Sequence, residues 1–381
     1  MRPPAAQVRD SAGVQIVENT GYQWPGGHGW RLSDAPLLDI GVLEGDPDYQ
    51  LYRVTGALRL GDGRLVVANA GANELRFYDS TGTYLSTSGA RGGGPGEFEG
   101  LTWLSASASD SLLAYDWRNR RISVFDAGGK FIRGFTLRAL SHAPPSHSYG
   151  AALGDGSLLI AAQAFFAAGQ VTTGVYRDTV FHLLFDKEGV LADTIGRHPG
   201  AEMYIAAVGE HLDVLQLPFG CSPHTTPFLD GFYFGRGDSY QIGYFAATGK
   251  LERIIRRPQA SAPVRPADIE SYTERQLAGV TDENERLIIE SVFEGMPFPE
   301  TMPAYHDLLA DAEGNLWVEE YRRPGDDQPR WTVFDPNGVM LGIVATPPDF
   351  QVYQIGYDFV LGRWTDDLDV EHVRLYELIR E

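Results

Sequence analysis

Short apolar runs, each bounded by turn-forming residues, recur along most of the chain. The run at residues 64–69 is apolar and partly β-branched; Asp62-Gly63 precedes it, and residues 70–73 follow as Ala-Gly-Ala-Asn. Because Asp, Asn and Gly accept the positive φ of tight turns, this pattern predicts a buried strand between two turns. The next run, residues 74–78, alternates polar and apolar positions, which is typical of a strand with one wetter face.

This unit recurs five times, at about residues 52–89, 101–137, 147–197, 223–257 and 303–346. Each copy has a turn, an apolar strand, and a second strand that ends in an aromatic residue before another turn, as at Phe125-Asp126 and Phe334-Asp335. Counting the strand that leads into the first turn, a unit holds about four strands, which is the content of one propeller blade.

The two ends of the chain supply the pieces of a sixth unit. Three strand-like runs follow residue 350, but no outer strand comes after them, whereas residues 37–41 resemble the end of a unit with no unit before it. Pairing the two pieces would close the ring and remove the exposed sheet edges. We therefore predict an all-β, six-bladed β-propeller closed by pairing of its N- and C-terminal strands. Seven blades are the alternative if residues 11–18 or 200–217 contribute more strands.

Two segments break the repeat. Residues 264–296 carry apolar residues at spacings of three and four with charges between them, which predicts two short amphipathic helices inserted between the fourth and fifth units. They would be either a stabilising lid or a gate over a ligand pocket or partner surface. Residues 197–222 are predicted to be a long connection of the kind that often carries function. We divide the chain into an N-terminal extension, 1–29, and the propeller, 30–381.

Charge and composition narrow the class of partner. Acidic residues outnumber basic ones 51 to 31, which gives a formal net charge of −20 and would repel nucleic acid and anionic lipid. No apolar run approaches the roughly 18 residues that a membrane span needs. A single cysteine, Cys221, excludes an internal disulfide and a multi-cysteine zinc site. The start lacks the apolar core of a secretory signal, so the protein is either cytoplasmic or exported with a signal that was trimmed or missed.

One linker carries a resemblance to a known family. The segment from Gly89 to Phe98, with its Gly-Gly-Gly-Pro-Gly run, and the later segment from Ile122 to Gly129 resemble the interblade signature of NHL-repeat propellers. The wider layout is similar to uncharacterised bacterial six-bladed propellers of that group. The resemblance implies a ligand- or protein-binding propeller, often exported, with hydrolase, lactonase and lyase relatives. The later units lack the Gly-Pro-Gly linker and have long insertions, so NHL functions do not transfer unit by unit.

Common enzyme signatures are absent from the sequence. It has no Gly-x-Ser-x-Gly elbow, no His-Glu-x-x-His and no Gly-Lys-Ser/Thr phosphate loop. The acidic run 366–371 lacks the ligand spacing of an EF-hand, which favours a solvated turn over a calcium site.

Superposing the units indicates a candidate site. The residue at or near the end of the apolar strand is polar in most units, and these positions would meet at one mouth of the central channel. They are Asn69, Asp116, Gln163, Arg236, Glu319 and, by analogy, Trp364. Near the starts of three innermost strands lie His147, His224 and His306.

Three imidazoles that converge could bind a divalent metal, calcium or zinc, with Asp116 or Glu319 as a carboxylate ligand. The alternative is that these histidines only form ordinary hydrogen bonds, since they do not align at one repeat position. The sequence thus predicts a binding module for a protein, peptide or small-molecule ligand. The other function it allows is a metal-assisted hydrolase or lyase acting on a small ester or lactone, with Glu319 or Asp116 as ligand or base.

Overall fold

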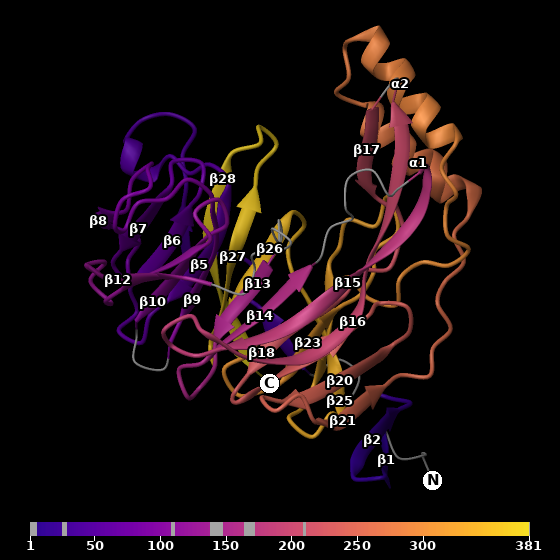
Figure 1. Cartoon of the computed structure of the whole chain (residues 1–381), viewed down its shortest axis with the longest axis horizontal. Coiled ribbons are helices and arrows are strands. Elements are labelled where there is room, and N and C mark those ends of the chain that lie inside the picture. Colours follow the sequence, from indigo (N-terminus) through magenta and orange to yellow (C-terminus); the bar gives the residue numbers. More distant parts are fainter. Residues whose placement is uncertain are drawn as a thin grey trace.

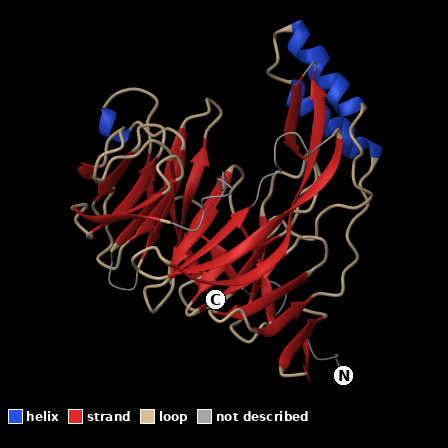
Figure 2. Ribbon diagram, in the orientation of Figure 1, coloured by secondary structure: helices blue, strands red, loops and turns tan. Residues whose placement is uncertain are grey.

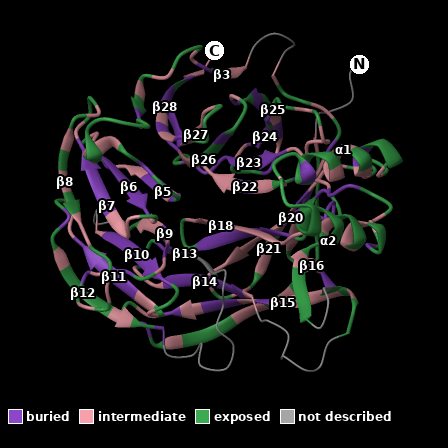
Figure 3. Cartoon of the chain, turned by 90° about the horizontal axis from the view of Figure 1, so that it is seen from above, coloured by how far each residue is buried: buried purple, intermediate pink, exposed green. Residues whose placement is uncertain are grey.

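The computed structural model describes residues 6–24, 29–107, 111–137, 148–163, 172–208 and 211–380. Within these ranges the strands form six sheets, and consecutive strands pair antiparallel. Figure 3 shows the first strands of the sheets, β5, β9, β13, β18, β22 and β26, around one axis. The chain is therefore an all-β propeller, and the number of described sheets equals the number of blades expected.

Three sheets have four strands in sequence order. The first contains β5 (Val54–Arg59), β6 (Leu65–Asn69), β7 (Glu74–Tyr78) and β8 (Tyr84–Ser88). The second contains β9 (Leu101–Ala106), β10 (Leu112–Asp116), β11 (Arg121–Phe125) and β12 (Phe131–Thr136). The fifth contains β22 (Asp307–Ala310), β23 (Leu316–Glu319), β24 (Arg330–Phe334) and β25 (Met340–Ala345).

The turn before β6 shows why the repeat folds this way. Gly63 has a φ of 89°, which only glycine adopts without strain, and the Asp62 carboxylate accepts a hydrogen bond from the Arg64 amide at 3.1 Å. All five residues of β6 are buried, as its apolar composition requires.

The third sheet is longer than expected. It contains β13 (Ser148–Ala152), β14 (Leu158–Gln163), β15 (Gly174–Phe185), β16 (Leu191–Val208) and β17 (His211–Gln216). Most of the segment 197–222, which we predicted as a loop, is therefore strand. Pro199 and Gly200, which suggested a loop, lie where the β15–β16 register shifts between Arg177 and Thr179, so a bulge accommodates them.

The fourth sheet contains β18 (His224–Phe228), β19 (Gly231–Gly235), β20 (Gln241–Ala246) and β21 (Leu251–Arg256). The N-terminal hairpin, β1 (Ala6–Ser11) and β2 (Val14–Asn19), extends this sheet, because β2 pairs parallel with β21. The described parts of segments 11–18 and 200–217 thus lengthen the fourth and the third sheet, respectively. Among the described residues they form no seventh sheet.

The sixth sheet joins the two ends of the chain, as predicted. It contains β26 (Phe350–Ile355), β27 (Phe359–Thr365) and β28 (Glu371–Arg380), and β28 pairs with β3 (Trp30–Leu32) and β4 (Leu38–Ile40). Ile40 lies opposite Val373, and the Leu37 amide donates to the Leu375 carbonyl at 2.7 Å. The ring is closed by these contacts.

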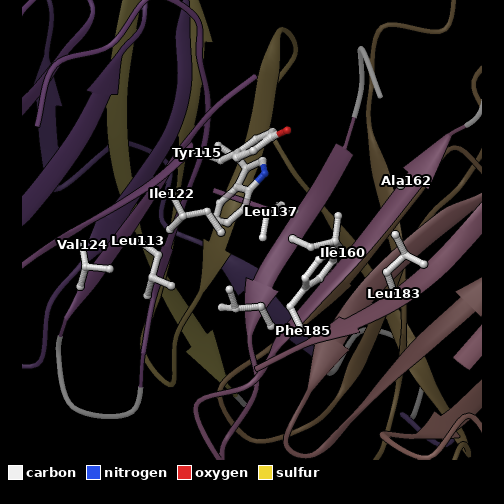
Figure 4. Packing of buried hydrophobic residues seen from close by; sticks show 11 residues of the cluster. Leu113, Tyr115, Ile122, Val124, Leu137, Ile160, Ala162, Leu183 and Phe185 are labelled. Carbon is white, nitrogen blue, oxygen red and sulfur yellow. The ribbon is translucent and has the colours of Figure 1, made fainter. Parts of the chain in front are cut away.

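Buried side chains pack between each pair of neighbouring sheets. Figure 4 shows the cluster between the second and third sheets, where Leu113 and Tyr115 meet Ile160 and Phe185. Five further clusters of described residues lie between the other neighbouring sheets, and one of them joins the sixth sheet back to the first. The core is thus a ring of interfaces, which is how a propeller buries its apolar surface.

The predicted helical insertion is present between β21 and β22. It consists of α1 (Pro266–Leu277) and α2 (Glu283–Glu294), and a 3₁₀ turn, η1 (Pro47–Tyr49), lies elsewhere. Helix α2 packs on the ends of the long third-sheet strands through Tyr204, Leu217 and Phe293, and α1 packs against α2. We call residues 200–208 and 211–217 together with α1 and α2 the tower; Figures 1 and 2 show it rising beside the ring. No helix in the described ranges is long and apolar enough to cross a membrane.

Candidate functional site

Two of the predicted site residues hold the backbone in place. Asn69 and Asp116 end β6 and β10, and both are buried. The Asn69 side-chain oxygen accepts from the Tyr52 amide at 2.8 Å, and the Asp116 carboxylate accepts from the Glu99 amide at 2.7 Å. In both sheets the donor lies 17 residues before the acceptor. These side chains therefore fix the loop that leads into the innermost strand.

Glu319 ends β23, at the corresponding place in the fifth sheet, but its surroundings differ. It is only 9% exposed, and its one carboxylate contact among the described residues is an ion pair with Arg322 at 3.7 Å. No backbone amide in those ranges donates to it. Burial raises the pKa of Glu319 to about 7, while the Arg322 charge lowers that pKa and Asp307 raises it further.

Glu319 faces a pocket of about 300 Å³ between the fifth and sixth sheets. The pocket lies where β23 and β27 end and where β22 and β26 begin; these strands are neighbours in Figure 3. Its lining residues are His306, Asp307, Glu319, Arg322, Trp331, Asp349, Phe350, Gln351, Val352, Arg363 and Thr365.

Strand register explains why three lining residues meet. Asp307, Glu319 and Trp331 are opposite one another on β22, β23 and β24, and cross-strand partners share one face of a sheet. Trp331 is 2% exposed, and its indole Nε1 has no hydrogen-bond partner in the described part of the chain. A buried donor without a partner is costly.

The histidines of the fourth and fifth sheets lie at the rim. The His306 amide donates to the Glu319 carbonyl at 2.7 Å, which sets the histidine beside the end of β23. Loss of hydration lowers the pKa of His306, against the opposing charge of Asp307, so its imidazole is neutral at pH 7. His224 Nδ1 lies 3.2 Å from Asp307 Oδ1 and connects the fourth sheet to the pocket wall.

The predicted metal triad is brought together only in part. His224 and His306 stand near the starts of neighbouring innermost strands, whereas His147 lies outside the described residues. Within the described ranges, no three His, Cys, Asp or Glu side chains are grouped so that they could hold a metal ion. The described residues alone do not supply a three-ligand site, and the triad stays a prediction.

On the sixth sheet, Arg363 is held by a network that reaches the first sheet. Its guanidinium lies 2.8 Å from the Glu371 carboxylate, and Glu371 also accepts from the Val54 amide at 2.7 Å. The Tyr353 hydroxyl donates to the Val54 carbonyl at 2.7 Å. These contacts orient Arg363 before any ligand binds.

The other predicted mouth residues do not line this pocket. Gln163 is half-buried at the end of β14, and the exposed Arg236 forms an ion pair with Asp238 at 3.2 Å. Trp364 carries the Arg374 guanidinium 3.3 Å from its ring centre. Sequence reasoning missed Arg322, Trp331 and Arg363, because their place in the pocket depends on strand register and on partners from other sheets.

Comparison with known proteins supports the fold. No family model matches the sequence, and no curated protein matches it. Among solved structures, a protein of Bacteroides fragilis NCTC 9343 described as predicted to be exported has 13% identity and a TM-score of 0.51, over 96% of this chain and 99% of that one.

Two further structures are less similar. A DUF4221-family member from Bacteroides vulgatus ATCC 8482 has 8% identity and a TM-score of 0.49, over 93% of this chain and 99% of that one. Virginiamycin B lyase from Staphylococcus aureus has 12% identity and a TM-score of 0.42, over 91% and 99%.

Proposed function

We propose that this protein binds a small, uncharged molecule rich in hydroxyl and carbonyl oxygens in the pocket between the fifth and sixth sheets. One observation carries the proposal: Glu319 occupies the position where Asn69 and Asp116 hold backbone amides, yet it has no such task and faces the pocket. A buried carboxyl group to which no backbone amide of the described residues donates is suited to a ligand.

The lining suits such a ligand in both charge and hydrogen bonding. Arg322 and Arg363 are donors, Asp307 and Asp349 are acceptors, and their formal charges balance. Glu319 is partly protonated near neutral pH and can donate or accept. A hydroxyl group also does both, and a carbonyl oxygen would accept from the guanidinium of Arg322 or Arg363.

Isothermal titration calorimetry with monosaccharides, the corresponding acids and the corresponding lactones tests the proposal. We expect one neutral compound class to bind to the wild type, and Glu319→Gln and Arg322→Met each to weaken it by about tenfold or more, since each removes a charge-assisted contact. Glu188→Gln, in an exposed turn between β15 and β16, is the matched control. Binding that survives both pocket variants would contradict the proposal, as would binding of the acids alone.

A second function, acid–base hydrolysis or elimination on a small ester or lactone, is favoured by Glu319 and His306, which both line the pocket. A carboxyl group with a pKa of about 7 can take up and release a proton near neutral pH, and the neutral imidazole of His306 can accept one. In hydrolysis, Glu319 would take a proton from water as that water attacks the carbonyl carbon, and it would then give that proton to the leaving oxygen as the carbon–oxygen bond breaks.

Turnover of small lactones and aryl esters distinguishes the two functions. Catalysis by this pair predicts a rate that rises through about pH 7 as Glu319 ionises, and a loss of about 100-fold or more in Glu319→Gln. Binding without turnover would contradict the catalytic function and support the binding function.

The metal-assisted form is tested separately by the metal content of protein purified without chelators. The comparison is between the wild type and a variant with His147, His224 and His306 all changed to alanine. Stoichiometric metal that is lost in the variant would support metal assistance, whereas metal retained in the variant, or none in either protein, would contradict it.

The finer family placement and the location are also proposals. The Gly89–Phe98 linker supports an NHL-like propeller, and export is supported by that resemblance and by the description of the similar Bacteroides fragilis protein. Fractionating the native host, with detection by antibody, tests export. Recovery with the cytoplasmic fraction alone would contradict it.

A further inference from the structure

The tower presents a sheet edge that no described residue covers. β17 is the last strand of the third sheet and pairs only with β16 in the described ranges. In Figure 1 it stands on the side of the tower nearer the rest of the ring. Because strand hydrogen bonds alternate in direction, about half of the backbone groups of β17 point away from β16.

This edge differs from the outer edges of the four-stranded sheets. The pairing of β8, β12 and β25 with their neighbours is broken by a register shift in each case, at Tyr78, Phe125 and Phe334. Such bulges twist an edge and discourage further pairing. The β16–β17 ladder runs through six residue pairs without a shift, so its edge stays regular.

The two faces of β17 are also unequal. Leu215 lies opposite Tyr204 and packs toward the helices, which anchors the strand. Leu212 and Val214 alternate with it and point to the other face, where they are 46% and 48% exposed. An added strand would therefore find free backbone groups beside an apolar surface.

The negative charge around β17 indicates which kind of strand could be added to its edge. The neighbouring helix α2 and its cap carry five acidic residues against Arg286, namely Asp282, Glu283, Glu285, Glu290 and Glu294, and β17 itself contains Asp213. The whole chain has a net charge of −20, so a second copy would be repelled and a basic segment attracted.

We infer that β17 binds an extended peptide segment with alternating apolar and basic residues, which adds to the third sheet as a further strand. This docking surface is separate from the pocket. It would use backbone hydrogen bonds for affinity, Leu212 and Val214 for the apolar side chains, and the acidic surface of the tower for the basic ones.

Fluorescence anisotropy with a labelled eight-residue peptide of alternating valine and lysine tests the inference. The same peptide N-methylated at every residue keeps its charges but has no amide donors, and a valine–glutamate peptide reverses the charge. We expect the first peptide to bind most tightly, the methylated form to bind more weakly by about tenfold or more, and the valine–glutamate peptide not to bind. Equal binding of the methylated form would overturn the inference, because simple charge attraction would then explain the affinity.

Variants locate the surface. Leu212→Ser with Val214→Ser removes exposed side chains only, so the fold should be kept, and it should weaken binding at least about tenfold. Ile132→Ser, at a 54% exposed position on the outer strand β12, is the matched control and should bind as the wild type does. A loss in the control equal to that in the double variant, or a β17-dependent dimer in sedimentation experiments, would overturn the inference.

Discussion

Asp116 and Glu319 occupy corresponding positions in two sheets, but their energetic roles are opposite. Asp116 is fully buried and accepts hydrogen bonds from the Glu99, Arg118 and Asn119 amides, whereas Glu319 accepts from no backbone amide in the described ranges. Repeat alignment can bring both positions to notice. It cannot show that their roles differ, because the role of each side chain depends on where the neighbouring loop places its backbone amides.

We expect Asp116→Ala to lower the free energy of unfolding by about 2–4 kcal/mol, since several buried amides would lose their acceptor together. Urea denaturation at pH 7 measures this. Glu319→Gln should not lower it under the same conditions, because that change removes a carboxylate that burial destabilises. A small effect at Asp116 would show that solvent replaces its hydrogen bonds.

The raised pKa of Glu319 makes stability depend on pH. Between its ordinary value of 4.5 and about 7, the folded state holds this proton more tightly than the unfolded state, so stability falls as pH rises. Above pH 7, the loss in the free energy of unfolding caused by this shift is at most about 3 kcal/mol. Glu319→Gln should remove it, so the variant should gain stability relative to the wild type from pH 4.5 to pH 8 in urea denaturation.

Glu188→Gln, at an exposed turn, provides the baseline for this comparison. Its difference from the wild type should stay constant with pH. If the free energies of unfolding of the wild type and Glu319→Gln changed with pH in parallel, Glu319 would titrate at its ordinary pKa. That result would remove the basis for its acid–base role.

At the scale of elements, local pattern predicted the strands well because each begins and ends at a turn that its own residues specify. The strands of the tower were missed for a physical reason. Pro199 and Gly200 indicate a break when read locally, but pairing with β15 carries the strand past them through a bulge. The helices were predicted from their periodicity, while the packing of α2 on Tyr204 and Leu217 depends on strands distant in sequence.

The start of α1 is fixed by one side chain that also reaches the ring. Asp268 accepts from the Arg265 amide at 2.8 Å and from the Arg323 guanidinium at 2.5 Å. Asp268→Ala should therefore lower the free energy of local unfolding of the first turn of α1 by about 1–2 kcal/mol. This should be seen as faster amide hydrogen exchange near residues 266–270. Exchange in the six sheets should not change.

Glu270→Ala is the matched control, because Glu270 is exposed on the same turn of α1. It should leave exchange as in the wild type. If Asp268→Ala gave the same result, α1 would be held by its packing on α2 and Phe219 alone, and the Arg323 contact would be incidental.

At the scale of the whole molecule, the ring depends on a contact between residues far apart in the chain. The sequence indicated this contact through an incomplete last unit and an orphan strand near residue 40, and closing the ring was the arrangement that left no edge there. The pocket is a product of the same closure. Arg363 is held by Glu371, which in turn accepts from Val54 across the seam between the sixth and first sheets.

Weakening the seam should therefore affect both stability and the pocket. Ile40 is 1% exposed in the cluster between the sixth and first sheets. Ile40→Ala should therefore lower the free energy of unfolding, measured by urea denaturation, by about 2–4 kcal/mol. Leu37→Ala, at a 58% exposed position just before the same strand, should cost well under 1 kcal/mol.

The two variants also separate a closed ring from a set of independently stable sheets. In a closed ring, the loss at Ile40 lowers one cooperative transition, because each sheet is stabilised by both neighbours. Tryptophan fluorescence and far-UV circular dichroism should then report the same midpoint in Ile40→Ala. If the two signals separated, the seam would open before the rest of the ring unfolds, and the orientation of Arg363 would be lost in that first step.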